Sequence, residues 1–401
     1  MLHERPAMAR YPHVVLLIET ASVHARHILS GVARYLNEHR PWSLFVLEYS
    51  GLDESLPRWL RDWRGDGLIC RFHLTPRAVE RLRSLQVPAV NLDDFPSNPW
   101  LPLICSDDMT IGRLAAEHLR QRCFRHFAFC GFTELEWSRK RREGFRRALN
   151  RGEFFTGAYE SAWGGWRSRS WEREQEDIEH WLRSLPKPVG VLACNDGRGR
   201  QIVDACQRAN LAVPEDVAVI GVDDDALLCE LCNPPLSSVM PDSERIGYEA
   251  AALLDHLMSG SRPSLRQWLI PPLGVRTRQS TDVLAIEDPD LTAAVRYIRE
   301  HACQGISVQD ILDQVSLSRT LLERKFRKYL GHSPQAEIRA VQLRRVQQLL
   351  AETHLRLERI AELAGYKYAE YMSVAFKRAT GQTPGRYRRE AQSAVRQIAA
   401  R

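Results

Sequence analysis

The stretch from Leu357 to Arg389, LERIAELAGYKYAEYMSVAFKRATGQTPGRYRR, predicts two short helices joined by a tight turn. We expect the helices over 357–363 and 368–379, with Gly381 as the stop of the second. Gly365 lies between them, where glycine takes a left-handed turn at no steric cost. Apolar residues at helical spacing are expected to bury one shared seam, formed by Ile360, Ala361, Ala364, Tyr366, Tyr371, Met372 and Phe376. This is a helix-turn-helix pattern, and it leaves the outward face of the second helix free for a partner.

The same pattern occurs a second time, about fifty residues upstream. Ile311 matches Ile360 at an offset of 49 residues, whereas Phe326 matches Phe376 at an offset of 50. The one-residue slip falls in the turn. One supersecondary unit used twice is hard to obtain by chance from composition. Residues 333–350 read as one long helix between the two copies, which would hold them at a fixed separation.

The second copy resembles the signature of the AraC-type DNA-binding domain. The matching positions are Ile360-Ala361, Ala364-Gly365-Tyr366, Tyr371, Phe376-Lys377-Arg378, Gly381, Thr383-Pro384 and Tyr387-Arg388. Three positions depart from the family pattern. Met372 stands where the family mostly has Phe, Tyr368 where it often has a small helix cap, and Val374 where it often has a basic or polar residue. The resemblance implies an all-α domain with tandem helix-turn-helix motifs that bind adjacent half-sites on DNA.

Spacing identifies the side chains of each second helix that face outward. The first of these helices is expected from Ser318, its N-cap, to about residue 329. A helix in the major groove meets base edges with its first two turns, and its basic residues can also contact phosphates or remain in solvent. The predicted DNA-contacting residues are Arg319, Thr320, Glu323 and Arg324 in the first copy and Lys367, Glu370, Ser373, Lys377 and Arg378 in the second.

Charge is unevenly distributed along the chain. Residues 286–401 contain 20 Lys+Arg and 13 Asp+Glu, a net of 20 − 13 = +7, and the rest has 36 − 37 = −1. The basic excess therefore coincides with the two helix-turn-helix copies. Phosphate neutralisation by DNA-binding proteins requires such an excess, although a basic segment alone is more often a solubilising face.

Length and composition set outer limits on the protein. A chain of 401 residues predicts two or three domains, and 44% apolar with 26% charged residues is ordinary for a soluble globular protein. No stretch approaches the roughly 20 apolar residues of a membrane span, and the start lacks a signal-peptide layout. Nine cysteines include one CxxC, at residues 229–232, but no second cysteine pair and no histidine-paired spacing, so they indicate no zinc site and no disulfide framework. We expect a cytoplasmic protein without a metal, a cofactor or membrane contact.

The first two thirds of the chain alternate between short apolar runs and amphipathic helices. Runs such as VVLLI at 14–18, VLA at 191–193 and VAVIGV at 217–222 have the length and composition of buried parallel strands. Strand and helix take turns about ten times, which predicts a doubly wound α/β fold. We expect two six-stranded sheets that form a two-lobed binder with a cleft over residues 1–285, and the all-α DNA-binding domain over residues 286–401.

Ligands of open parallel sheets bind outside the carboxyl ends of the strands. The residues that we assign to such positions are Glu19, Asp66, Asp93, Asp107, Gly131, Asn195, Asp196 and Asp223. Most of them are acidic or carry an amide. Such groups suit a ligand rich in hydroxyls, because each carboxylate accepts two or more hydrogen bonds.

Four segments resemble the sugar-sensing core that LacI-type repressors share with periplasmic sugar-binding proteins. They are Cys105–Leu119, Arg141–Leu149, Leu192–Arg200 and Val219–Val239, in the order and spacing of that family. With an AraC-type domain behind it, the sensor resembles xylose-responsive bacterial activators. The combination implies a sugar-responsive transcription regulator of a pentose catabolism operon, with a small sugar, D-xylose, as effector. It also implies a homodimer on DNA, with RNA polymerase as a further partner.

The predicted sugar-binding residues are Asp66, Trp137, Arg141, Asn195, Asp196 and Asp223, with Glu19 and His24 as weaker candidates. The resemblance implies that Arg141 donates to sugar hydroxyls and that Asp223 accepts from them. Five of the six main candidates, all except Asp223, also have a plain alternative. Asp66 can be a turn former, Arg141 a solvated arginine, Trp137 a core residue, and Asn195 or Asp196 a helix cap.

No nucleophile, base and oxyanion site occurs together in the sequence, so we expect no enzyme. Two other functions remain open at this point. One is a solute-binding or enzymatic α/β domain with an accessory DNA-binding tail, and the other is a DNA-binding regulator that needs no ligand.

Overall fold

The computed structural model describes residues 11–47, 58–61, 63–71, 80, 82–93, 101–162, 170–261, 267–283, 288–353 and 355–389. The chain divides into two compact units, Met1–Val283 and Leu284–Arg401. The predicted domain boundary, between residues 285 and 286, lies outside the described residues.

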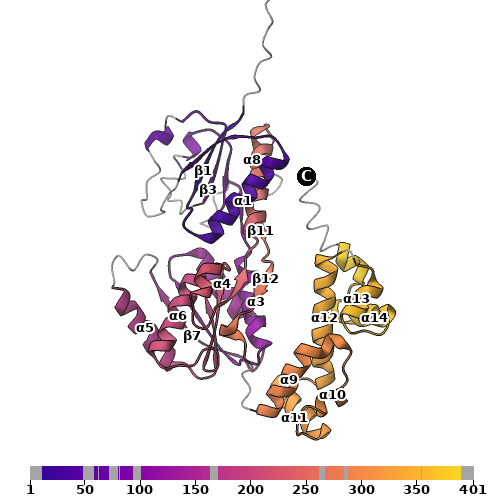
Figure 1. Ribbon diagram of the computed structural model, residues 1–401. Coiled ribbons are helices and arrows are strands. Elements are labelled where there is room, and N and C mark those ends of the chain that lie inside the picture. The colour runs from indigo at the N-terminus through magenta and orange to yellow at the C-terminus, as the bar shows by residue number, and fades with distance from the viewer. Residues whose placement is uncertain are drawn as a thin grey trace, which may run out of the picture. The chain divides into compact units, whose positions relative to one another are not determined.

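The first unit contains two six-stranded sheets (Figure 1). The first sheet has the order β11-β5-β4-β3-β1-β2, and all of its strand pairs are parallel. Its strands are β1 (His13–Ile18), β2 (Ser43–Leu47), β3 (Gly67–Arg71), β4 (Ala89–Asn91), β5 (Leu103–Ser106) and β11 (Gln267–Ile270). The buried runs of β1 and β3 are continuous, as expected for strands covered on both faces.

The second sheet has the order β12-β10-β9-β8-β6-β7 and is parallel except for the edge strand β12. Its strands are β6 (His126–Phe132), β7 (Phe154–Ser161), β8 (Val189–Ala193), β9 (Val217–Val222), β10 (Ser237–Met240) and β12 (Gly274–Arg276). The chain passes between the lobes three times, after β5, after β10 and between β11 and β12. The two lobes are therefore not consecutive halves of the sequence.

The helices of each lobe cover its own sheet. The first lobe has η1 (Arg58–Arg61), α1 (Val23–Glu38) and α8 (Ser243–Met258), and α8 packs against β3, β4 and β5 although it follows a strand of the second lobe. The second lobe has α3 (Asp108–Arg120), α4 (Glu136–Arg147), α5 (Trp171–Ser184), α6 (Asp196–Arg208), α7 (Ala226–Glu230) and η3 (Gln279–Thr281).

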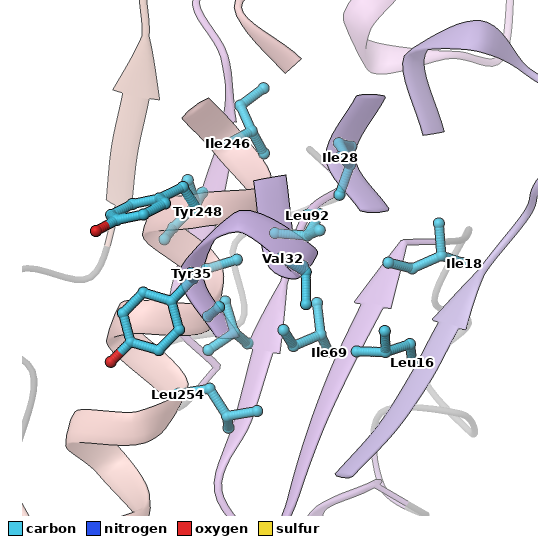
Figure 2. Close-up of a cluster of buried hydrophobic side chains, with 14 of the residues drawn as sticks. Leu16, Ile18, Ile28, Val32, Tyr35, Ile69, Leu92, Ile246, Tyr248 and Leu254 are labelled. Carbon is cyan, nitrogen blue, oxygen red and sulfur yellow. The ribbon is translucent and has the colours of Figure 1, made fainter. Parts of the chain in front are cut away.

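Close backbone contact joins α1 to α8. A Cβ on Gly31 would lie 1.9 Å from the carbonyl oxygen of Glu244, and one on Gly247 would lie 1.9 Å from that of Ile28. The two glycines thus allow the helices to touch. Figure 2 shows side chains of both helices meeting those of the sheet in one apolar cluster, among them Ile28, Val32, Tyr35, Ile246, Tyr248, Leu254, Leu16, Ile18, Ile69 and Leu92.

The second unit is all α-helical in its described residues. It consists of α9 (Pro289–His301), η4 (Ala302–Gln304), α10 (Val308–Leu312), α11 (Arg319–Leu330), α12 (Pro334–Glu352), α13 (Leu357–Leu363) and α14 (Ala369–Thr380). The N-terminal half of α12 packs on α9, α10 and α11 through Ile338, and its C-terminal half packs on α13 and α14 through Val346 and Leu350. One long helix therefore carries two small cores.

The structure confirms the predicted fold class, with two α/β sheets followed by tandem helix-turn-helix motifs. One prediction within it is wrong. Tyr371 was expected in the buried seam of the second motif but is 76% exposed, because the neighbouring Met372 occupies the inward position and is fully buried.

Candidate functional site

Asp66 does not lie at the ligand-binding edge of its sheet, and its assignment to a strand end was wrong. It precedes β3, and its carboxylate Oδ2 accepts a hydrogen bond of 2.7 Å from the backbone N–H of His13 at the start of β1. The strands β1 and β3 are parallel, so both residues lie at the amino ends. Asp66 therefore fixes the start of two strands, which is a structural role.

Arg141 is the buried centre of the candidate effector site. Its Nε donates to Asp108 Oδ1 at 2.7 Å, and its Nη1 donates to the carbonyl oxygen of Cys194 at 2.6 Å, at the carboxyl end of β8. Nη1 also lies 3.9 Å from Asp223 Oδ1, beyond hydrogen-bonding distance. Within the described part of the chain, Nη2 has no hydrogen-bond acceptor. Two of the guanidinium nitrogens are thus used to orient the group.

The electrostatics of Arg141 follow from this position. Burial lowers the pKa of its guanidinium, but the carboxylates of Asp108 and Asp223 outweigh that effect, and the net pKa lies above the usual value. The side chain is therefore a fixed cation. Helix α4 begins at Glu136, so Trp137 and Arg141 lie four residues apart on one face of the same helix. The Arg141 Cζ lies 4.8 Å from the centroid of the half-buried Trp137 ring.

Asp223 follows β9 directly, at the same edge of the second sheet. Its φ of 107° is rare for a residue with a side chain, and this strain is typical of functional sites. The next residue, Asp224, anchors the loop through ion pairs with Arg276 at 2.7 Å and Arg278 at 2.8 Å. Burial raises the pKa of the Asp223 carboxyl, while Arg141 and Arg71 oppose that shift. The anchored loop holds the carboxylate next to Arg141.

Asn195 and Asp196 both have structural partners at the start of α6. Asn195 is the N-cap, and its Oδ1 accepts from the Arg198 N–H at 2.9 Å. Asp196 is 1% exposed, and its two carboxylate oxygens accept from Ser238 Oγ and the Asp225 N–H, each at 2.7 Å. Burial and then repulsion by Asp223 raise the pKa of Asp196 well above its usual value. Asp196 therefore supports the loop that carries Asp223 through its bond from the Asp225 N–H.

The first lobe contributes residues from the carboxyl ends of its own strands. Glu19 follows β1, Arg71 ends β3, and their side chains form an ion pair at 3.9 Å. His24 is the second residue of α1, and its Nδ1 is 2.6 Å from Ser243 Oγ. Burial, followed by the charges of Arg71 and of Arg141 in the other lobe, lowers the pKa of His24 well below its usual value, so the ring is neutral. A charge at the carboxyl edge of the second sheet, that of Arg141, therefore affects the pKa of His24 at the carboxyl edge of the first sheet.

Sequence reasoning missed Arg71 and Asp108. Arg71 directly follows the apolar run GDGLIC at residues 65–70 and is the last residue of β3, so the strand-end rule would have found it had the rule been applied to the end of that run. Asp108 follows β5 and the N-cap Asp107, and its role appears only once α3 and α4 pack together. Among the described residues, fixed cations, carboxylates and a neutral imidazole are gathered at this site. That mixture of donors and acceptors suits a neutral polyhydroxyl ligand.

In the second unit, α11 presents a polar outward face. Leu322 and Phe326 are fully buried, whereas Arg319, Thr320 and Arg324 are exposed. Ser318 caps the helix, because its Oγ accepts from the Leu321 N–H at 3.3 Å. Glu323 is half exposed, and its Oε1 lies 3.8 Å from the Arg319 Nε. The outward positions predicted for this helix are therefore on one accessible side.

Helix α14 has the same inward pattern and a different outward one. Met372 and Phe376 are buried, and Lys367, Glu370, Lys377 and Arg378 are exposed, while Ser373 is half exposed. Tyr368, the N-cap, makes no side-chain capping bond. Large apolar side chains are also exposed on this helix, with Tyr371 at 76% and Val374 at 69%.

A direct contact ties the two motifs together. Gln342, in the middle of α12, is buried, and its Nε2 donates to the carbonyl oxygen of Ala302 at 3.0 Å and to that of Gly365 at 3.1 Å. Gly365 has a φ of +77°, and a Cβ there would lie 2.8 Å from the Ala302 oxygen. The turn of the second motif therefore rests on the segment that follows α9.

Comparisons with known proteins agree with both units. A model of the periplasmic binding protein-like domain matches residues 116–281, and one of the helix-turn-helix domain matches residues 311–390. The xylose operon regulatory protein of Escherichia coli K12 is 31% identical over 385 residues, which cover 94% of this chain and 96% of that protein. This chain belongs to the family of the xylose operon regulatory proteins.

Other members of the family show the same extent of similarity. The xylose operon regulatory protein of Haemophilus influenzae Rd is 31% identical over 391 residues, covering 94% of this chain and 98% of that protein. A solved structure of the xylose-binding transcription activator xylR superposes with a TM-score of 0.61 and 31% identity, covering 95% of this chain and 98% of that one. The chain is thus a DNA-binding transcription regulator with a periplasmic-binding-like sensor, and it is not an enzyme.

The described residues offer no candidate for a membrane span or for a metal site. None of the helices that the structure describes is both long and apolar enough to cross a membrane. No group of three or more His, Cys, Asp or Glu side chains is placed to hold a metal ion within those same ranges.

Proposed function

We propose that this chain is a D-xylose-responsive transcription activator, with residues 1–285 as the sensor and 286–401 as the DNA-binding domain. The observation that carries the proposal is the pairing of Arg141 with Asp223 at the carboxyl edge of the second sheet. A fixed donor beside a strained acceptor matches vicinal hydroxyls of a small sugar. The sugar itself is inferred from the printed names of the xylose operon regulatory proteins and of xylR.

The residues proposed to bind the sugar come from both lobes. Arg141 Nη2 and the Asp223 carboxylate bind hydroxyls, the Asn195 amide donates, and Trp137 packs against the apolar face of the ring. Arg71, Glu19 and His24 complete the site from the first lobe. Asp66 and Asp196 are left out, because their carboxylates bind the protein itself.

The proposed DNA contacts are made by α11 and α14 in successive major grooves. Arg319, Thr320, Glu323 and Arg324 read bases from α11, and Lys367, Glu370 and Ser373 do so from α14. Lys377 and Arg378 lie in the last turn of α14 and neutralise phosphates. In this proposal a homodimer places two copies of the helix pair on the operator, and the bound dimer activates through contact with RNA polymerase.

Calorimetry on the full-length protein tests the sensor. D-xylose, L-arabinose, D-ribose and D-glucose are titrated in turn, and D-xylose is expected to bind most tightly. Asp223→Asn and Arg141→Lys each remove a charge-assisted contact, so each should weaken xylose binding by about tenfold or more. Asp66→Asn is the matched control, because Asp66 lies at the amino edge, and it should retain the wild-type affinity.

Two results would overturn the proposal. Equal losses in Asp66→Asn and Asp223→Asn would mean that the sugar does not bind at the carboxyl edge. DNA binding that stays the same with every sugar, together with no heat of binding, would favour a regulator that needs no ligand.

A further inference from the structure

Helices α11 and α14 can be compared residue by residue. Each has 12 residues and ends at a left-handed glycine, Gly331 with φ 79° and Gly381 with φ 75°. The buried anchors Phe326 and Phe376 are fifty residues apart, as are Leu322 and Met372. Positions fifty residues apart are therefore equivalent in the two motifs.

In this register the outward faces differ in chemistry. Val374 is equivalent to the exposed Arg324, and the exposed Tyr371 is equivalent to the half-buried Leu321. Tyr371 and Val374 are three residues apart and share one face of α14. Where α11 offers a guanidinium, α14 offers an isopropyl group and a phenol ring.

The surroundings of this face favour DNA as its occupant. Exposed lysine and arginine side chains border it at both ends of α14, with Lys367 before the helix and Lys377 and Arg378 in its last turn, and one acid, Glu370, lies among them. The Lys367 Nζ lies 5.4 Å from the centroid of the Tyr368 ring. A cationic border around an apolar strip complements a groove that is lined by phosphates and contains methyl groups.

We propose that α14 reads thymines in its half-site through apolar contacts of Tyr371 and Val374 with their 5-methyl groups in the major groove, beside the base contacts already proposed for Lys367, Glu370 and Ser373. Valine forms no hydrogen bonds with a base edge, and the thymine methyl is the apolar group that a base pair presents there. Helix α11 reads its half-site through hydrogen bonds from Arg324. This inference rests on the proposed entry of both helices into DNA.

The test replaces thymine by deoxyuridine, which removes only the methyl group. Duplexes are first enriched from a random pool by the full-length protein with D-xylose, and each half-site is then synthesised with dU in place of dT. Each methyl contacted by α14 should contribute about fourfold to affinity, from the burial of one methyl-sized apolar group. In Val374→Ala and Tyr371→Ala the penalty for dU in that half-site should shrink or vanish.

Arg324→Ala is the matched control, because it changes the other recognition helix. It should retain the dU penalty that Val374→Ala removes. An unchanged dU penalty in both α14 variants would overturn the inference while DNA binding stands. So would variants that bind every duplex normally yet activate RNA polymerase poorly, because the face would then dock a protein. Failure to enrich any duplex would overturn the DNA-binding function and the inference with it.

Discussion

The two helix-turn-helix motifs share an interior and differ at the surface. Both second helices bury a pair of apolar anchors, and both end at a left-handed glycine. Outside, α11 carries Arg324 and a serine cap, whereas α14 carries Val374 and no side-chain cap. The difference teaches that the buried residues identify the motif in a sequence. The DNA sequence that the motif binds is instead decided by surface residues, which contribute little to the fold.

The largest expected effect concerns the shared interior. Phe326→Ala and Phe376→Ala each remove a fully buried ring, and each should cost about 3 to 5 kcal/mol of local stability. Hydrogen exchange of the helices in the second unit measures both losses. A loss below about 1 kcal/mol in one of them would show that the two interiors are not equivalent.

The turns provide a second comparison, with smaller effects. Gly365→Ala should cost about 2 to 4 kcal/mol, because alanine meets both an unfavourable φ and the Ala302 oxygen. Gly331→Ala is the control, since Gly331 has a similar φ and no atom within 4 Å of a built Cβ. It should cost about 1 to 2 kcal/mol. Thermal unfolding of the two variants side by side gives the difference, and equal losses would contradict the contact.

Substitutions at the surface sharpen the comparison of DNA contacts. Arg324→Ala should relax the preference at one base pair by roughly 1 to 3 kcal/mol. Lys377→Ala should weaken all sites alike and lower the salt dependence of binding, because it removes a phosphate contact. Fluorescence anisotropy on enriched and random duplexes separates the two effects. If both variants lost equal affinity for specific and for random DNA, the assignment of Arg324 to a base contact and of Lys377 to a phosphate contact would be refuted.

The caps give the smallest expected effect. Ser318→Ala removes the side-chain oxygen that accepts from the Leu321 N–H and should cost about 1 kcal/mol. Tyr368→Ala removes no capping bond and should leave the start of α14 nearly as stable as before. Hydrogen exchange in the first turn of each helix distinguishes them. A larger loss for Tyr368→Ala would assign the tyrosine a packing role instead.

Most of the second unit could be predicted from sequence, because helix periodicity and caps are local signals. The expected helix over 357–363 has those bounds in the structure, and α14 lies one residue from its expected place. The failure at Tyr371 has a physical reason. Tyr371 and Met372 are adjacent and both apolar, and spacing alone does not decide which of the two points inward. The core that decides it includes Val346 and Leu350, from another helix.

The candidate effector site was predicted less well, because it depends on contacts between distant segments. The rule that ligands bind at strand ends placed Asp223 and Asn195 just beyond the carboxyl ends of strands, where the structure also has them. It misplaced Asp66, because the start of the run at 65–70 was taken for its end. Arg141 was found by resemblance, but its orientation by Asp108 and by the carbonyl of Cys194 depends on packing across 33 and 53 residues of sequence.

The buried Gln342 amide has a consequence for the promoters that this regulator serves. Gln342 joins Gly365, in the turn of the second motif, to Ala302, which precedes the first motif. We expect this link to restrict rotation of the two motifs about α12. An extra base pair between the elements they read would rotate one element by about a tenth of a helical turn, and the duplex would have to absorb that torsion. We therefore expect these promoters to tolerate base substitutions within either element better than a change in the spacing between the two elements.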